Sequence, residues 1–104
     1  MQLDGYRFQG YEGEEVPRWV QKLIVNPGVH VLPHNLCRDH EFLREVTLPE
    51  GLIEIGSFSF YACKCLLAIK ICRTVESIGG DAFRSCNLLT KVEFELSSSP
   101  HQLK

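Results

Sequence analysis

The residues best suited to chemistry in this chain of 104 residues are its cysteines and histidines. Cys63, Cys65 and Cys86, together with His40, offer the sulfur and nitrogen ligands that Zn²⁺ binds in a tetrahedral site. However, Cys63-Lys64-Cys65 has one residue between the cysteines, whereas zinc sites use two to four. We therefore retain a Cys/His metal-binding module only as the less favoured hypothesis, and we expect no cofactor.

The five cysteines also have a simpler interpretation as hydrophobic groups. Their number is odd and the chain starts without a secretory signal, which argues against a disulfide framework. Buried thiols behave as small apolar side chains. We expect Cys63 and Cys86 to stack in one column with parallel Cβ vectors, an arrangement that does not favour a disulfide between them.

Other catalytic patterns are weak in this sequence. His34 lies near Cys37, but no third group at a recognisable spacing would orient a Cys–His nucleophile pair. Gly79-Gly80 lacks the further glycines and the Lys or Ser/Thr of a phosphate-binding loop, so we expect a plain bend there. We predict that the protein is not an enzyme.

Composition excludes several classes of partner. The net charge is −2 with acidic and basic residues mixed, whereas nucleic acids and anionic membranes require a basic excess. No apolar run approaches the roughly 20 residues that span a bilayer, and the first residues do not form a signal peptide. We expect a cytoplasmic or otherwise intracellular protein, or a cell-surface protein if the chain is a fragment.

The elements that must position these residues recur every 23 residues. The segment IGSFSFYAC at 55–63 returns as IGGDAFRSC at 78–86, and a fixed period of this length indicates stacked repeats. The same step aligns five columns of aliphatic or Phe residues, and a sixth apolar column contains Trp19, Phe42, Cys65 and Leu88. The five columns are Val20, Leu43, Leu66 and Leu89; Leu23, Val46, Ile69 and Val92; Val25, Leu48, Ile71 and Phe94; Val29, Leu52 and Val75; and Leu32, Ile55 and Ile78.

Each turn of the repeat is predicted to contain a strand, a bend, a second apolar wall and a short return. Ile69 and Ile71 flank Lys70, which is the pattern of a strand with one buried face. The returns are expected to be brief helical or 3-10 turns, and Asp81 is expected to cap the one at 82–85, which brings Phe83 into the core. Because one turn cannot bury its own apolar edge, several must stack. We predict a solenoid of about three to four turns with parallel strands.

The pattern L-x-x-I-x-I at 66–71, followed by Val75, Ile78-Gly79, Ala82-Phe83 and Cys86, resembles the BspA-like subfamily of leucine-rich repeats. Residues 43–63 match it nearly as well. Residues 20–42 match loosely, because Pro33, Cys37 and His40 replace the Gly, Phe and Cys of the pattern. The resemblance implies a curved solenoid that presents a surface to other macromolecules, and it implies no catalytic residues.

We expect three segments in the chain. Residues 1–18 form an N-terminal cap or leader, in which Tyr6, Phe8, Tyr11 and Val16 cover the open end of the first turn. Residues 19–96 form the repeats, at 20–42, 43–65, 66–88 and, in part, 89–96. Residues 97–104 are Ser-rich and are expected to be disordered.

Two surfaces remain as candidates for function. The first, named here the strand face, is the exposed and mostly polar face of the predicted strand ladder with its edge, and its mixed charge favours a protein partner. The strand face consists of Lys22, Glu45, Thr47, Ala68, Lys70, Arg73, Lys91 and Glu93. The second is an uncapped C-terminal end that includes Val92 and Phe94, which favours self-association or a structural role in a longer array.

Overall fold

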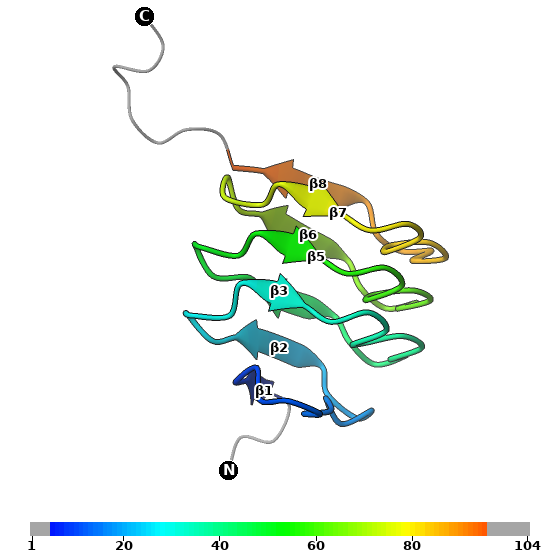
Figure 1. The fold of residues 1–104 in the computed structure, drawn as a ribbon. Coiled ribbons are helices and arrows are strands. Elements are labelled where there is room, and N and C mark those ends of the chain that lie inside the picture. The colour runs from blue at the N-terminus through cyan, green and yellow to red at the C-terminus, as the bar shows by residue number, and fades with distance from the viewer. Residues whose placement is uncertain (1–4, 96–104) are drawn as a thin grey trace, which may run out of the picture.

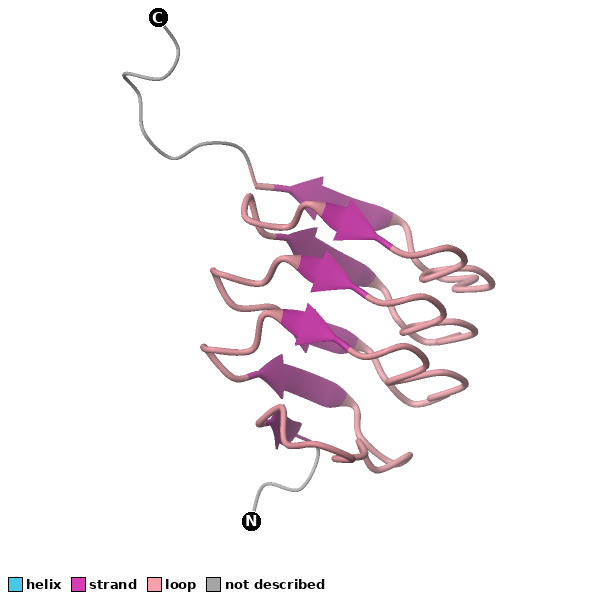
Figure 2. Ribbon diagram, in the orientation of Figure 1, coloured by secondary structure: helices cyan, strands magenta, loops and turns pink. Residues whose placement is uncertain are grey.

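The computed structural model describes residues 5–95 and contains eight short strands joined by turns (Figure 1). No helix occurs in this part of the chain (Figure 2). The predicted tail at 97–104, residue 96 of the partial repeat and residues 1–4 of the predicted cap lie outside the described residues. The strands are β1 (Gly5–Phe8), β2 (Lys22–Val25), β3 (Val31–Leu32), β4 (Glu45–Thr47), β5 (Glu54–Ile55), β6 (Ala68–Ile71), β7 (Ser77–Ile78) and β8 (Lys91–Phe94).

The strands form two parallel sheets, between which the chain passes back and forth (Figure 1). The larger sheet has the order β1-β2-β4-β6-β8 and the smaller has the order β3-β5-β7. In the larger sheet Lys22 pairs with Glu45, Glu45 with Ala68 and Ala68 with Lys91, so each step is one 23-residue repeat. The predicted solenoid of parallel strands stacked turn on turn is confirmed.

The core lies between the two sheets and is formed by the predicted columns. Leu23 and Ile69 from the larger sheet are buried, as are Leu32 and Ile55 from the smaller sheet. The columns become exposed in the last described turn, which no further turn within residues 5–95 covers. Phe83 is therefore only partly buried and packs against the edge of the core, rather than inside it as predicted.

The returns between the sheets differ from the predicted helical turn. Asp81 and Ser85 both have positive φ angles, 58° and 65°, and so do their counterparts 23 and 46 residues earlier. Left-handed residues at both ends interrupt a right-handed helix, so Asp81 is not a helix cap. Some backbone N–H groups bond to the neighbouring turn, as in the 2.9 Å bond from Phe60 N to Ala82 O. Others close single turns between residues three apart, as in the 3.2 Å bond from Arg84 N to Asp81 O. The returns are therefore ladders of turns that stack on one another.

Gly56 and Gly79 occupy one column for a reason that the sequence analysis did not identify. Neither has a positive φ, so the predicted need for a sharp bend does not explain them. A Cβ on Gly56 would lie 2.6 Å from the carbonyl oxygen of Leu32 and 2.8 Å from the backbone nitrogen of His34. Glycine is required here because successive turns approach each other closely.

The N-terminal segment extends the larger sheet, although its spacing differs from that of the repeats. Gly5 pairs with Lys22 and Phe8 with Val25, a step of 17 residues rather than 23. Phe8 and Val16 are buried, whereas Tyr11 is exposed and does not contribute to the core. The role of this segment as a cap stays a prediction.

A carboxylate organises the loop that follows β1. Glu14 accepts hydrogen bonds from the Tyr6 hydroxyl at 2.7 Å and from the backbone N–H groups of Gln9, Gly10 and Tyr11 at 2.8–3.1 Å. The bond to Glu14 is the main reason why the pKa of Tyr6 is raised to about 12. Burial acts to raise the pKa of Glu14, but its hydrogen bonds outweigh burial and lower that pKa below the usual 4.5.

Acidification is expected to loosen this loop. Because the pKa of Glu14 is lower in the folded state, its ionised form stabilises that state above about pH 4.5, and this contribution is lost as the pH falls through the lowered value. Amide exchange of Gly10 and Tyr11, measured by NMR against pH, should accelerate relative to the intrinsic rate. Glu14→Gln should do the same at pH 7, whereas Glu12→Gln should not. Unchanged protection in Glu14→Gln would contradict this role of the carboxylate.

Candidate binding surface

The strand face begins with two rows of side chains that point outward from the larger sheet. Alternate residues of each strand point to opposite sides, so the residues flanking the buried Leu23, Val46 and Ile69 lie on the outer side. The parallel register aligns them from strand to strand. The first row is Lys22, Glu45, Ala68 and Lys91, and the second is Thr47, Lys70 and Glu93. The structure thus brings seven of the eight predicted residues onto one outer face.

A shallow hollow lies in the middle of this face. Its volume is about 230 Å³, and it is lined by residues of both rows together with Val46 and Ile69, whose side chains belong to the core. Ala68 creates the hollow because its short side chain stands between Glu45 and Lys91 in the first row. Small-molecule pockets are usually roughly 300–1,000 Å³ and more enclosed, so the hollow is better suited to a side chain of a partner protein.

The charges of the face are mixed and exposed. Lys91 Nζ lies 3.4 Å from Glu93 Oε2 within β8. In residues 5–95, Lys22, Glu45 and Lys70 form no ion pair and are exposed. Lys22, Glu45 and Lys70 are therefore available to pair with charges of another molecule. The exposed pair of Lys91 and Glu93 contributes little to stability, so it could be exchanged for such a contact as well.

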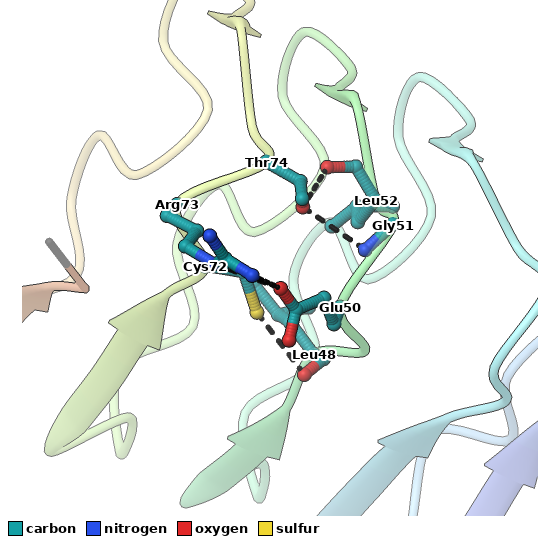
Figure 3. Close-up of polar contacts among 7 residues, drawn as sticks. All are labelled: Leu48, Glu50, Gly51, Leu52, Cys72, Arg73 and Thr74. Carbon is teal, nitrogen blue, oxygen red and sulfur yellow. Dashed lines mark hydrogen bonds and ion pairs between the residues drawn. The ribbon is translucent and has the colours of Figure 1, made fainter. Parts of the chain in front are cut away.

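Arg73 lies at the edge of the face and is already paired. Its Nε donates to Glu50 Oε2 at 2.8 Å and its Nη2 lies 2.6 Å from the same oxygen (Figure 3). Beside this pair, the Thr74 hydroxyl donates to Leu52 O at 2.8 Å and accepts the N–H of Gly51 at 3.0 Å. Arg73 thus helps to join two successive turns, which separates it from the other members of the strand face.

Sequence reasoning missed Arg7 as a neighbour of the face. Arg7 is the exposed residue of β1 and pairs in register with Ile24, which pairs in turn with Thr47, so Arg7 lies in line with the second row two strands beyond it. Its guanidinium donates to the side-chain oxygen of Asn26 at 3.2 Å. The alternation Tyr6-Arg7-Phe8 could have indicated a strand, but the 17-residue step to β2 hid its register.

The sixth apolar column does not enter the core. Trp19, Phe42 and Leu88 are about half exposed, at 52%, 56% and 50%, and Cys65 is partly exposed. Each of these residues lies three positions before the first outward residue of the strand that follows it. The column therefore runs along the solenoid beside the amino ends of the strands. We name these four residues the apolar ladder.

Over residues 30–102 the chain matches the family described as BspA type Leucine rich repeat region (6 copies). This match covers more than half of the sequence. The chain belongs to the BspA-type leucine-rich repeat family. The resemblance found in the repeats is confirmed, and the family is a repeat scaffold of the kind that presents binding surfaces. No curated protein and no solved structure was found to match the chain.

The cysteines of the BspA-type turns bond to the backbone of the preceding turn. Cys63 Sγ donates to Cys37 O at 3.1 Å, Cys86 Sγ to Phe60 O at 3.0 Å and Cys72 Sγ to Leu48 O at 3.3 Å. All five thiols are free. Burial is the main reason why the pKa of Cys63 is raised to about 12. Burial also raises the pKa values of Cys37, Cys72 and Cys86. These thiols act as part of the core.

In the described part of the chain, no group of three His, Cys, Asp or Glu residues is placed to hold a metal ion. The buried His40 occupies the column of Cys63, but both ring nitrogens face carbonyl oxygens: Nε2 lies 2.7 Å from Val16 O and Nδ1 lies 3.2 Å from Arg38 O. His34 Nδ1 accepts the N–H of Ser57. His40 thus connects the first BspA-type turn to the N-terminal segment.

Thiol labelling should separate the five cysteines by burial. Cys65 lies in the partly exposed apolar ladder, so we expect iodoacetamide to modify it first at pH 8. Cys37 and Cys63 should react only when the protein unfolds, because burial keeps them as thiols. Mass spectrometry of peptides from a labelling time course measures this order. Rapid modification of Cys63 in the folded protein would contradict its buried position.

No helix that could cross a membrane is present between residues 5 and 95. The cellular compartment stays a prediction.

Proposed function

We propose that this BspA-type repeat protein is a protein-binding module that engages its partner through the strand face. The observation that carries the proposal is the pair of outward rows, in which exposed charges of both signs surround a shallow hollow. The parallel register aligns these side chains along one hydrogen-bonded sheet. A preorganised surface loses little entropy when it binds. Binding, rather than catalysis, is the role we assign to the repeats.

The apolar ladder supports the same proposal. Interfaces between proteins have apolar and aromatic centres with polar rims, and binding energy concentrates in Trp, Tyr and Arg residues. Trp19 and Phe42 are aromatic and half exposed, and they lie at the ends of the strands that carry Lys22 and Glu45. We propose that the partner contacts the charged rows and at least part of this ladder.

The test compares charge variants of equal net charge. Lys22→Glu/Lys70→Glu reverses two charges of the strand face and leaves β8 unchanged. Lys64→Glu/Arg84→Glu reverses two exposed charges outside both the face and the ladder, and serves as the matched control. Partners are captured from cells by proximity labelling with each variant, and their affinities are then measured with purified proteins by calorimetry.

We expect the strand-face variant to lose a partner that the wild type and the control retain, with binding that weakens as salt increases. Circular dichroism must show that all three proteins are folded. If the strand-face variant binds every partner as tightly as the control does, the proposal is wrong.

A second candidate function is self-association through the C-terminal end of the described solenoid. Val92 is 44% exposed and Phe94 is 62% exposed, although their counterparts Ile69 and Ile71 in the preceding turn are buried. Exposed positions of a core column need a covering surface. We propose that a second copy of the chain provides it.

A further inference from the structure

The outer edge of β8 offers backbone groups for pairing. Within residues 5–95, β8 pairs only with β6. Glu95 N donates to Ile71 O at 2.8 Å, on the β6 side. Because successive residues of a strand direct their backbone groups to opposite edges, Phe94 and Val92 direct their N–H and C=O groups away from β6. Such an edge is a template for another strand.

We propose that β8 pairs antiparallel with β8 of a second copy, with Val92 on the two-fold axis. This inference rests on the second candidate function, self-association, and adds its geometry. A two-fold interface places the same surface on both partners. At the axis the two Val92 residues would exchange backbone hydrogen bonds, and the two larger sheets would join into one continuous sheet.

Charge selects this register. With Val92 on the axis, Lys91 lies opposite Glu93 of the second copy, and Glu93 lies opposite its Lys91. These are non-hydrogen-bonded positions, where side chains approach most closely. Centring the pair on Lys91 or on Glu93 would instead place two like charges opposite each other, and centring it on Phe94 would place Glu93 opposite Glu95. The Val92-centred register alone gives two attractive pairs and no repulsive one.

The same pairing covers the exposed apolar end. Val92 would pack against its symmetry copy on the inner side of the joined sheet, next to Phe94. A hollow of about 370 Å³ lies between β7 and β8 and is bordered by Ile71, Val75, Ile78 and Phe94. It provides space for apolar side chains from the second copy. Apolar burial would thus provide affinity while the charges define the register.

The test uses charge reversal on the full chain. Lys91→Glu places acidic residues opposite each other across the proposed interface, and Glu93→Lys does the same with basic residues. Two attractive pairs then become repulsive, which corresponds to a rise in the dimer Kd on the order of 30-fold. Sedimentation velocity over a concentration series should show the wild type as a dimer in a range where each variant alone is a monomer.

Mixing the two variants should restore the dimer. The first variant has two acidic positions and the second has two basic ones, so every cross-strand pair of the mixed dimer is attractive. The double variant Lys91→Glu/Glu93→Lys should also dimerise by itself, because exchanging the charges preserves both pairs in the Val92-centred register. In a register centred on Glu93 the double variant would keep like charges opposite each other and would stay monomeric.

Val92→Pro provides an independent check, because it removes an N–H that points to the free edge and leaves the bonds to β6 intact. It should be a folded monomer by circular dichroism and sedimentation. If the wild type is monomeric at every concentration, self-association itself is wrong, and the β8 pairing that rests on it is wrong as well. If the wild type dimerises but charge reversal and mixing have no effect, self-association stands and the β8 pairing is wrong.

Discussion

Replacing Phe60 with Ala is expected to lower the free energy of unfolding by about 3–5 kcal/mol. Phe60 is fully buried in the middle of the solenoid, and its ring stacks on Phe83 with centroids 5.4 Å apart. Removing the ring leaves a cavity that the turns on either side cannot close, because their own backbone bonds hold them in place. A loss of this size is a large fraction of the stability of a small domain. Urea denaturation followed by circular dichroism measures it.

Two aromatic controls test this interpretation. Phe83→Ala should cost less than Phe60→Ala, because Phe83 is only partly buried at the edge of the core. Phe42→Ala should be nearly neutral, because Phe42 is 56% exposed in the apolar ladder. The three variants remove the same side chain and differ in burial. Equal losses for Phe60→Ala and Phe42→Ala would contradict the core described above.

The second large effect is expected at Gly56, where Gly56→Ala should destabilise the protein by about 1–3 kcal/mol. The added methyl would meet backbone atoms of Leu32, Pro33 and His34 at 2.6–2.8 Å, and backbone cannot move aside as a flexible side chain can. The turn at 56 would have to move away from the preceding turn and lengthen the 3.0 Å bond from Gly56 N to Leu32 O.

Gly80 supplies the matched control for this substitution. A Cβ at Gly80 would have no atom within 4 Å, and its φ is not positive. Gly80→Ala should therefore stabilise the protein by about 0.4–1 kcal/mol, because alanine reduces the entropy of the unfolded chain. Thermal unfolding by calorimetry compares the two variants. If Gly56→Ala also stabilises the protein, the turns are not as closely stacked as the structure indicates.

The strand face was predictable because two periods act together. The 23-residue step aligns Lys22 with Glu45, and alternation within a strand directs both to the outer side. Neither feature requires knowledge of distant contacts. Arg73 shows the limit of this reasoning: its position near the strand was predicted, but its 2.6 Å ion pair with Glu50 depends on how two turns stack.

At the ends of the solenoid the sequence predicted an exposed Val92 and Phe94 and a cover from Phe8 and Val16, but not the geometry of either end. The apolar character of Val92 and Phe94 follows from their columns, yet their exposure depends on whether another turn covers them. Likewise, Phe8 and Val16 are buried through a strand that pairs 17 residues away from its neighbour, outside the repeat period. A periodic pattern predicts which apolar side chains of one turn the next turn must cover. It does not predict which residues cover the apolar side chains of the terminal turns.

The sequence determined the repeat period, the parallel solenoid and the outward rows, because each depends on spacing within one turn and on identical spacing in the next. Only the tertiary structure decided the form of the returns, the reason for Gly56 and the role of His40. The returns are stacked turns with hydrogen bonds between them rather than helices. Gly56 lacks a side chain that would clash with the backbone of the preceding turn, and His40 forms a hydrogen bond with the carbonyl oxygen of Val16. These features arise from contacts between turns, whose distances a list of residues does not contain.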